Sequence, residues 1–184
     1  MEEIIKSVIE KISSYNIFNN LFPGIVFCSV VEQTTRFSLV RDGVWENLFI
    51  YYFVGMIISR MGSIFIEKWL KTIKVKNRKT NCKEPFLKFA PYNMYIEASQ
   101  NDPFIMTLNE MNNVYRTIIA TVTLIMITKL FDWLIYDWVK RLGQIGNNLF
   151  VVIVCLLIIM LFIYSYKKQT DYIRSRIEKY NDKK

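Results

Sequence analysis

Apolar residues fall in four long blocks along the 184-residue chain, and polar stretches rich in Lys and Arg separate the blocks. The blocks cover residues 16–35, 45–66, 114–136 and 148–166. Each is close to the ~20 residues that a helix needs to cross the hydrocarbon core of a bilayer. Hydrophobic residues make up 52% of the chain, and only six Gly and four Pro interrupt it. We therefore predict an all-α integral membrane protein with four transmembrane helices.

The same pattern divides the chain into five parts. They are an amphipathic N-terminal helix (1–15), a first transmembrane hairpin (16–66), a basic cytoplasmic loop with helices (67–113), a second transmembrane hairpin (114–166) and a cytoplasmic helical tail (167–184). The first block is the least regular, because Asn19, Asn20 and the pair Pro23-Gly24 lie inside it. We expect a kink or break there, near the inner end of the helix.

The second block carries small residues at every fourth position, Gly55, Ser59 and Ser63. Small residues at this spacing allow helix backbones to approach closely in lipid, so we expect this stripe to pack against another helix. The alternative is that the stripe lines a pore.

Apolar periodicity continues beyond the last two blocks. Asp102 and Pro103 form a typical helix start, and the repeat that follows leads into the third block without a breaker. The fourth block continues into the tail through a heptad-like repeat. We call these two stripes the seam: Phe104, Leu108, Met111, Tyr166, Ile173, Ile177 and Tyr180. The third and fourth helices should thus extend into a small basic cytoplasmic lobe, where the stripes bury each other or meet across subunits.

Positive charge is distributed unequally between the two predicted sides. Of the 24 Lys and Arg residues, 17 lie in the N-terminal segment, the 67–113 loop and the tail, and four lie in the other two connections. Because Lys and Arg collect on the cytoplasmic side, the N- and C-termini are both predicted to be cytoplasmic.

Polar residues within or beside the blocks are candidates for a pore or another intramembrane role, since charge is costly in lipid. They are Glu32, Asn47, Arg60, Lys129 and Asp132. Lys129 and Asp132 stand three residues apart and can pair on one helix face, and Glu32 can join them. A local ion pair and an outer constriction of a pore both fit. Arg60 lies within snorkelling reach of the inner headgroups.

The basic loop and tail are candidates for binding a nucleotide or oligonucleotide. Their cationic residues are Lys74, Lys76, Arg78, Lys79, Lys83, Arg174 and Arg176. Nearby aromatic residues such as Phe86, Phe89, Tyr92 and Tyr95 can stack on bases, or form a small core of the lobe. The same charges also hold these segments inside and contact anionic lipid.

Enzymatic chemistry finds no support in the sequence. The chain has no His, its three Cys are not paired in spacing, and it contains no phosphate-binding, dinucleotide-binding or hydrolase motif. We expect no enzyme, no cofactor and no metal site.

Three segments prompt a resemblance to a known group of proteins: Phe22-Pro23-Gly24, YYFVGMIISRMGS, and FAPYNMYIEASQNDP leading to NNVYRT. With the overall layout, they resemble the small four-span membrane components of prokaryotic antiphage defence systems, either a Hailong-type effector or a Kiwa-type membrane subunit. The resemblance implies a multi-pass protein of the prokaryotic cytoplasmic membrane.

Two functions remain open at this stage. The first is a homo-oligomeric membrane effector or ion channel of antiphage defence, gated by an anionic cytoplasmic signal of nucleotide type. The second is a membrane-anchored sensor or scaffold that recruits a soluble partner protein. A transporter is less favoured, because inverted repeats and a midplane relay of acidic residues or His are not visible.

Overall fold

A computed structural model describes residues 14–76 and 82–181 of the chain. The predicted helix 1–15 lies almost wholly outside this part, as do Arg78, Lys79 and the side chain of Tyr180. The described chain is mostly helical, which confirms the predicted class.

The first predicted span is one helical rod of three segments. These are α2 (Ser14–Asn16), the π-helical stretch η1 (Ile17–Leu21) and α3 (Phe22–Thr34). Pro23 follows the π-helical stretch directly, inside the continuous rod, and its missing N–H leaves one carbonyl of the preceding turn without an intrahelical donor. The expected irregularity therefore takes the form of a change in winding next to Pro23, and the helix is not broken.

The second predicted span is longer than its apolar block. It joins α4 (Val44–Met61), the π-helical stretch η2 (Gly62–Ile66) and α5 (Glu67–Thr72) into one continuous helix. The six residues after the block, Glu67–Thr72, therefore extend the helix beyond its apolar part.

The predicted basic loop contains a small sheet that the apolar pattern does not indicate. Strands β1 (Lys74–Lys76) and β2 (Lys83–Pro85) pair in antiparallel register. The helix α6 (Tyr92–Asn101) follows and lies against the start of the next long helix and the end of the last one.

The two remaining helices are the longest. Helix α7 (Phe104–Leu134) is unbroken for 31 residues, and a short turn helix, α8 (Tyr136–Arg141), leads into α9 (Gly143–Asn181) with 39 residues. Asp102 Oδ1 accepts a hydrogen bond from the Phe104 N–H at 2.9 Å, which confirms the predicted helix start. Gly143 adopts φ +59°, a left-handed conformation that suits glycine, and it turns the chain from α8 into α9.

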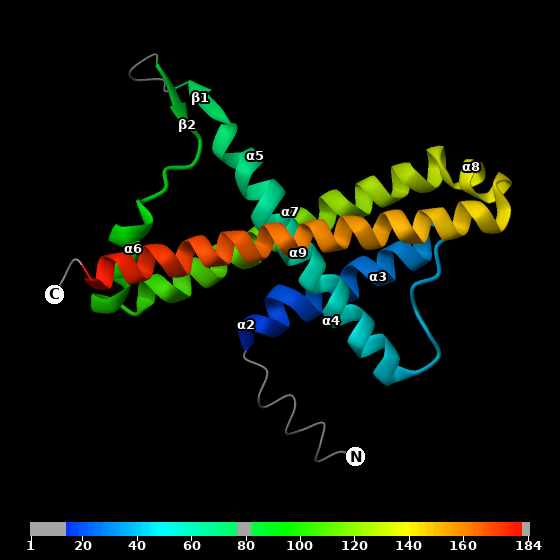
Figure 1. Ribbon diagram of the computed structural model, residues 1–184, viewed down its shortest axis with the longest axis horizontal. Helices are drawn as coiled ribbons and strands as arrows, with labels where there is room; N and C mark the ends of the chain where they lie inside the picture. Colours follow the sequence, from blue (N-terminus) through cyan, green and yellow to red (C-terminus); the bar gives the residue numbers. More distant parts are fainter. Residues whose placement is uncertain (1–13, 77–81, 182–184) are drawn as a thin grey trace.

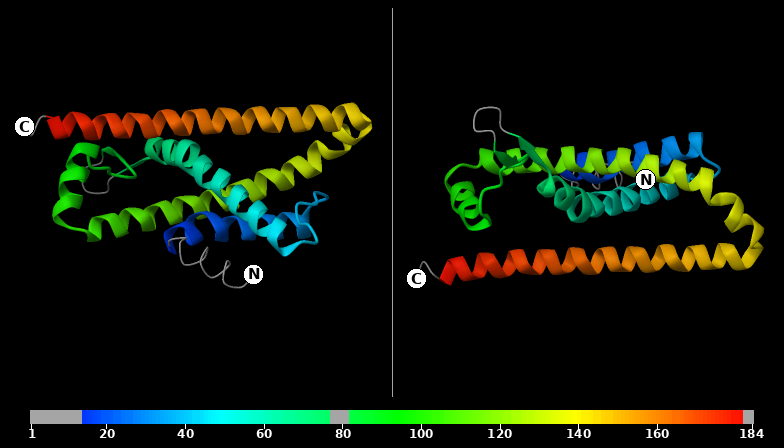
Figure 2. Two further views of the ribbon diagram at one scale, coloured as in Figure 1. Left: turned by 60° about the horizontal axis from the view of Figure 1, so that its bottom comes forward. Right: turned by 90° about the horizontal axis from the view of Figure 1, so that it is seen from above.

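The helices pack as a layer of α3, α4 and α7, with α9 running alongside (Figures 1 and 2). The hairpin β1–β2, α6 and the C-terminal end of α9 gather at one end of the molecule. The 35–43 connection and α8 gather at the other end. Among the described side chains, few apolar ones are buried: Cys28, Val31, Ile58, Ile96, Ala120 and Leu161.

Within residues 14–76 and 82–181, three helices are long and apolar enough to cross a membrane. They are Val44–Thr72, Phe104–Leu134 and Gly143–Glu178. The 14–34 rod is not one of the three. Most large apolar side chains on these helices are exposed, as in proteins whose helices face lipid.

Candidate functional site

Polar side chains join the long helices at three levels. We name them the Glu67 centre (Ser63, Glu67, Lys71, Arg116, Lys168), the Asn19 network (Asn19, Ser59, Thr117) and the Arg36 clamp (Arg36, Asp132, Tyr136, Asp137). Each level connects segments that are distant in the sequence. The Glu67 centre is the candidate functional site, because it joins three long helices through one carboxylate.

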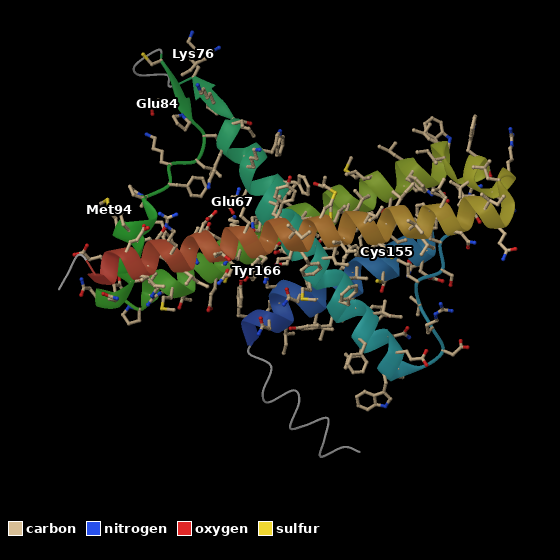
Figure 3. All side chains as sticks on the ribbon, in the orientation of Figure 1. Glu67, Lys76, Glu84, Met94, Cys155 and Tyr166 are labelled. Carbon is tan, nitrogen blue, oxygen red and sulfur yellow. The ribbon has the colours of Figure 1, made fainter. Side chains whose placement is uncertain are left out.

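Glu67 is a carboxylate surrounded by three cations. Its Oε2 accepts hydrogen bonds from Arg116 Nη1 of α7 at 2.8 Å and from Lys168 Nζ of α9 at 2.9 Å, and its Oε1 accepts one from Lys71 at 2.8 Å. The Glu67 side chain is 14% exposed. One carboxylate thus ties the α4–α5 helix to α7 and α9, at the place where Figure 3 shows Glu67 beside their crossing.

Lys168 of α9 donates several hydrogen bonds to the α4–α5 helix. Besides Glu67, its ammonium donates to the backbone carbonyl and to the hydroxyl of Ser63, each at 2.9 Å. Three acceptors from the α4–α5 helix therefore hold one lysine of α9. Such a set of charge-assisted bonds is directional and stronger than a single surface ion pair.

An aromatic stack reinforces the same junction from the lobe. Tyr172 of α9 stacks on Tyr92 of α6 with ring centroids 4.8 Å apart, and Tyr92 stacks on Tyr95 at 6.1 Å. Lys71 lies over the ring of Phe89 at 4.5 Å. These aromatic residues attach the lobe to α9 and to the Glu67 centre.

The Asn19 network is buried inside the helix layer. Asn19 donates to Ser59 Oγ of α4 at 2.8 Å, and its carbonyl oxygen accepts from Thr117 Oγ1 of α7 at 2.8 Å. All three residues are buried. The amide of a residue in the π-helical stretch η1 therefore connects the first rod to α4 and α7.

Two glycines allow the first rod and α4 to cross closely. A Cβ on Gly55 would stand 1.6 Å from the backbone oxygen of Asn20, and a Cβ on Gly24 would stand 1.8 Å from that of Tyr51. Neither position has room for any side chain. The stripe predicted for packing faces its neighbours at each level: Gly55 meets the first rod, Ser59 meets Asn19, and Ser63 meets Lys168.

The Arg36 clamp lies at the opposite end of the molecule. The Arg36 guanidinium bonds Asp132 at 3.0 Å and Asp137 at 2.7 Å, and it lies 3.9 Å from the centre of the Tyr136 ring. Desolvation lowers the pKa of Arg36, but the hydrogen bonds to the two aspartates outweigh it and raise the pKa above its usual value. The clamp fixes the connection after α3 to the end of α7.

Arg36 is the partner of Asp132, and the expected pairing with Lys129 is wrong for these described residues. Lys129 donates to the backbone carbonyl of Thr34. The i, i+3 spacing makes a pair of Lys129 and Asp132 possible on one helix. The Arg36 guanidinium, from the connection after α3, instead supplies several hydrogen bonds to Asp132 at once.

The other polar candidates occupy separate positions. Glu32 accepts hydrogen bonds from the backbone of Leu39 and Val40, so it shapes the 35–43 connection and does not join Lys129 and Asp132. Asn47 exchanges two 2.7 Å hydrogen bonds with the backbone of Arg41 at the start of α4. Arg60 is exposed. The structure does not bring these residues together.

The predicted anion-binding residues are divided between two places. Lys74, Lys76 and Lys83 are exposed on the hairpin, whereas Arg174 and Arg176 are exposed on α9. Figure 1 and the right view of Figure 2 show the hairpin apart from the C-terminal end of α9. Figure 3 likewise places Lys76 at the hairpin, away from Glu67. The described members of this set do not form one site.

The seam is not buried within one chain. Its described side chains are exposed on α7 and α9, among them Phe104 at 62% and Tyr166 at 76%. Of the two arrangements expected, the seam stripes do not cover each other inside a monomer. Contact across subunits remains a prediction.

The sequence alone does not assign a role to Glu67 or Lys168. A signal was nevertheless present, because Glu67 continues the fourfold spacing of Gly55, Ser59 and Ser63. A charged residue on a packing face must meet a partner. The identity of that partner depends on how the helices cross, which periodicity does not specify.

Comparisons with family models, with curated proteins and with solved structures found no match to this chain. The features of the fold itself define the class of this protein. It is a mostly helical protein whose described part has three helices that suit a membrane, joined by a part-buried ion-pair centre.

Proposed function

We propose that this protein is a four-span protein of the prokaryotic cytoplasmic membrane that assembles with copies of itself. In this proposal it acts as an ion-channel effector of antiphage defence, gated through its cytoplasmic end. The defence role rests on the sequence resemblance. The gating role rests on the arrangement of α9.

Charge distribution and length support four spans with both termini inside. The basic hairpin, α6 and the end of α9 share one end of the molecule, and the less basic 35–43 connection and α8 share the other. The 14–34 rod is about 31 Å long at 1.5 Å per residue, close to the ~30 Å hydrocarbon core. Its contacts with α4 and α7 place it beside two candidate spans.

The observation that carries the proposal is the isolation of α9. It is the most apolar of the three candidate spans, and 6% of its apolar window is buried within one chain. Lys168 and Tyr172 hold it to the rest of the protein near the lobe, and Phe150 stacks on Phe131 near α8. The apolar length between these contacts is available to other copies.

Rigid continuity supplies the coupling that gating needs. Helix α9 runs without interruption from the turn at Gly143 to the lobe, so a shift at Lys168 moves the whole apolar segment. A ligand or partner that changes the Glu67 centre would therefore displace the helix inside the membrane.

The assembly state and ion conduction test the proposal together. Native mass spectrometry should give a defined multiple of the 22.0 kDa chain mass. Liposomes containing the purified protein should pass ions. Ile173→Asp and Ile177→Asp, which place a charge in the seam, should reduce the subunit number or alter the flux.

The matched control is Ser175→Asp, which adds the same charge to the opposite face of α9. It should leave both readouts as in the parent protein. A monomer that does not conduct would exclude the proposal.

A second candidate function is a scaffold that recruits a soluble partner. The observation in its favour is the hairpin, whose exposed Lys74, Lys76 and Lys83 stand away from the helices. A stable complex with an acidic partner, lost in Lys74→Glu and without ion flux, would support this candidate.

A further inference from the structure

A cavity of about 330 Å³ opens between α5 and α9, beside the Glu67 centre. Its charged lining consists of Glu67, Lys68, Lys71, Lys167, Lys168 and Asp171. Four lysines thus face two carboxylates, which leaves a net positive charge of two. This cavity includes none of the residues predicted from the sequence to bind an anion.

The four lysines are not equally engaged. Lys71 and Lys168 bond Glu67, and Arg116 bonds the same carboxylate from behind. Lys68 and Lys167 are exposed and take part in no ion pair within the described part of the chain. Three cations share the single negative charge of Glu67, so this carboxylate leaves positive charge in excess around it. The cavity retains charge for an external anion.

The position of the cavity favours a phosphate group. Ser63 lies near the end of the second apolar block, and Lys167 directly follows the fourth, so the cavity sits at the boundary of the apolar segments. Tyr164 and Tyr172 complete the lining with hydroxyl groups and apolar ring faces. Basic pockets between membrane helices on the cytoplasmic side suit anionic headgroups.

We propose that this cavity binds a phosphate group, carried by an acidic lipid or by a soluble phosphate compound, with Lys68 and Lys167 as its first contacts. Lysine binds phosphate as a point charge and does not require fixed geometry. One lysine comes from α5 and the other from α9, so the bound phosphate bridges the two helices. It also offers Lys71 and Lys168 an alternative acceptor to Glu67.

This inference rests on the membrane placement in the proposed function and deepens it, because it names the ligand class that acts on the Glu67 centre. It predicts that ligand occupancy and the α5–α9 junction are linked. A phosphate that shares Lys168 with Glu67 changes the bonds that hold α9.

Trp69 provides a local probe for binding. It belongs to α5 next to Lys68 and is 59% exposed. The other three tryptophans lie elsewhere: Trp45 at the start of α4, Trp133 at the end of α7 and Trp138 in α8. In a protein that keeps Trp69 and has Phe at the other three positions, fluorescence is measured in phosphatidylcholine nanodiscs. Brominated phosphatidylglycerol should quench Trp69 more strongly than brominated phosphatidylcholine at the same fraction.

Lys68→Gln and Lys167→Gln should each weaken the apparent affinity for brominated phosphatidylglycerol about fivefold. The matched control is Lys74→Gln, which removes the same single charge from the hairpin. It should leave the preference unchanged. Both changes affect exposed side chains, and thermal unfolding of each variant verifies that it is folded.

A second arm separates the two sources of phosphate. Inorganic phosphate is added at constant ionic strength, and its ³¹P signal is followed. A lipid preference that phosphate does not remove assigns the cavity to the headgroup. Broadening of the phosphate signal that disappears in Lys68→Gln assigns it to a soluble ligand.

The inference is overturned if neither lipid preference nor phosphate broadening is observed, or if the hairpin control loses as much as the cavity variants. A protein that conducts ions but shows neither the lipid preference nor the phosphate broadening contradicts this site alone. A protein that prefers the acidic lipid but never conducts retains the site and contradicts the proposed function.

Discussion

Single polar residues inside the apolar helices determine how these helices meet. Asn19, Ser59 and Thr117 form one hydrogen-bonded group from three segments, in a region otherwise packed by apolar side chains and glycine. In lipid, where apolar surface gives little drive for association, such bonds and close backbone contact stabilise helix packing.

Thr117→Val should therefore lower the free energy of unfolding by about 1 kcal/mol, because the carbonyl of Asn19 loses its donor. The measurement is unfolding in mixed detergent micelles as the denaturing detergent is increased. Thr123→Val is the matched control on the same helix, since the Thr123 hydroxyl bonds the backbone of Ile119 on an exposed surface. Equal losses in the two variants would refute a special role for the network.

Residue-level prediction from the sequence was successful where local spacing decides the outcome. The repeat of Gly55, Ser59 and Ser63 indicates a packing face, and those three positions do meet neighbouring segments. It was unsuccessful where the partner comes from another part of the chain. Asp132 bonds Arg36, which is 96 residues away, and spacing along one helix cannot reveal this.

At the scale of elements, the junction of α5 and α9 depends on Glu67. Its carboxylate is the acceptor that the α4–α5 helix, α7 and α9 share, so its loss affects several helices together. Removing one member of a part-buried ion group leaves the other members without their partner.

Glu67→Gln should loosen the contact between α5 and α9. Spin labels at Trp69 and Gln169, both exposed, report the distance between these helices in protein whose Cys28, Cys82 and Cys155 are replaced by Ala. Dilution with unlabelled protein removes distances between copies. We expect a broader distribution shifted to longer distances.

Glu178→Gln is the control for this change, since Glu178 pairs with Arg174 on the exposed surface of α9. It should leave the distribution as in the parent. If Glu67→Gln also leaves it unchanged, the carboxylate does not hold α9.

Elements differ in how far the sequence predicts them. The start of α7 is predicted because Asp102 and Pro103 are a local signal, and the Asp102 carboxylate indeed caps that helix. The hairpin is not predicted, because its strands have three residues each, mostly charged, and show no apolar alternation. The π-helical stretches η1 and η2 arise where helices cross, which depends on tertiary packing.

For the whole molecule, the proposed orientation places the hairpin inside the cell. Cys82 is an exposed native residue next to β2, so a membrane-impermeant thiol reagent should label it only when the cytoplasmic face is accessible. The protein for this measurement has Ala in place of Cys28 and Cys155. Labelling of Cys82 from the periplasmic face would invert the topology.

Ser38→Cys provides the complementary position in the same background with Cys82 replaced by Ala. Ser38 is exposed in the 35–43 connection, at the end opposite the hairpin. This cysteine should react with the impermeant reagent in cells whose outer envelope is permeabilised and whose cytoplasmic membrane is intact. Two reactive positions on one side would contradict the single crossing, Val44–Thr72, that the proposal places between them.

The sequence predicts the helical class and the approximate lengths of the apolar segments, because composition and periodicity determine both. It does not predict where α9 contacts the layer of α3, α4 and α7. Those contacts include the bonds of Lys168 to Ser63 and Glu67 and the stacking of Phe150 on Phe131, which long-range packing brings together.

The most direct test of the account is ion flux through liposomes containing Glu67→Gln, compared with the parent protein and with Glu178→Gln. If the Glu67 centre controls α9 and α9 belongs to a conducting assembly, Glu67→Gln should change the flux several-fold, and Glu178→Gln should match the parent. Folded and correctly inserted protein that passes no ions, in the parent and in Glu67→Gln alike, would contradict the account.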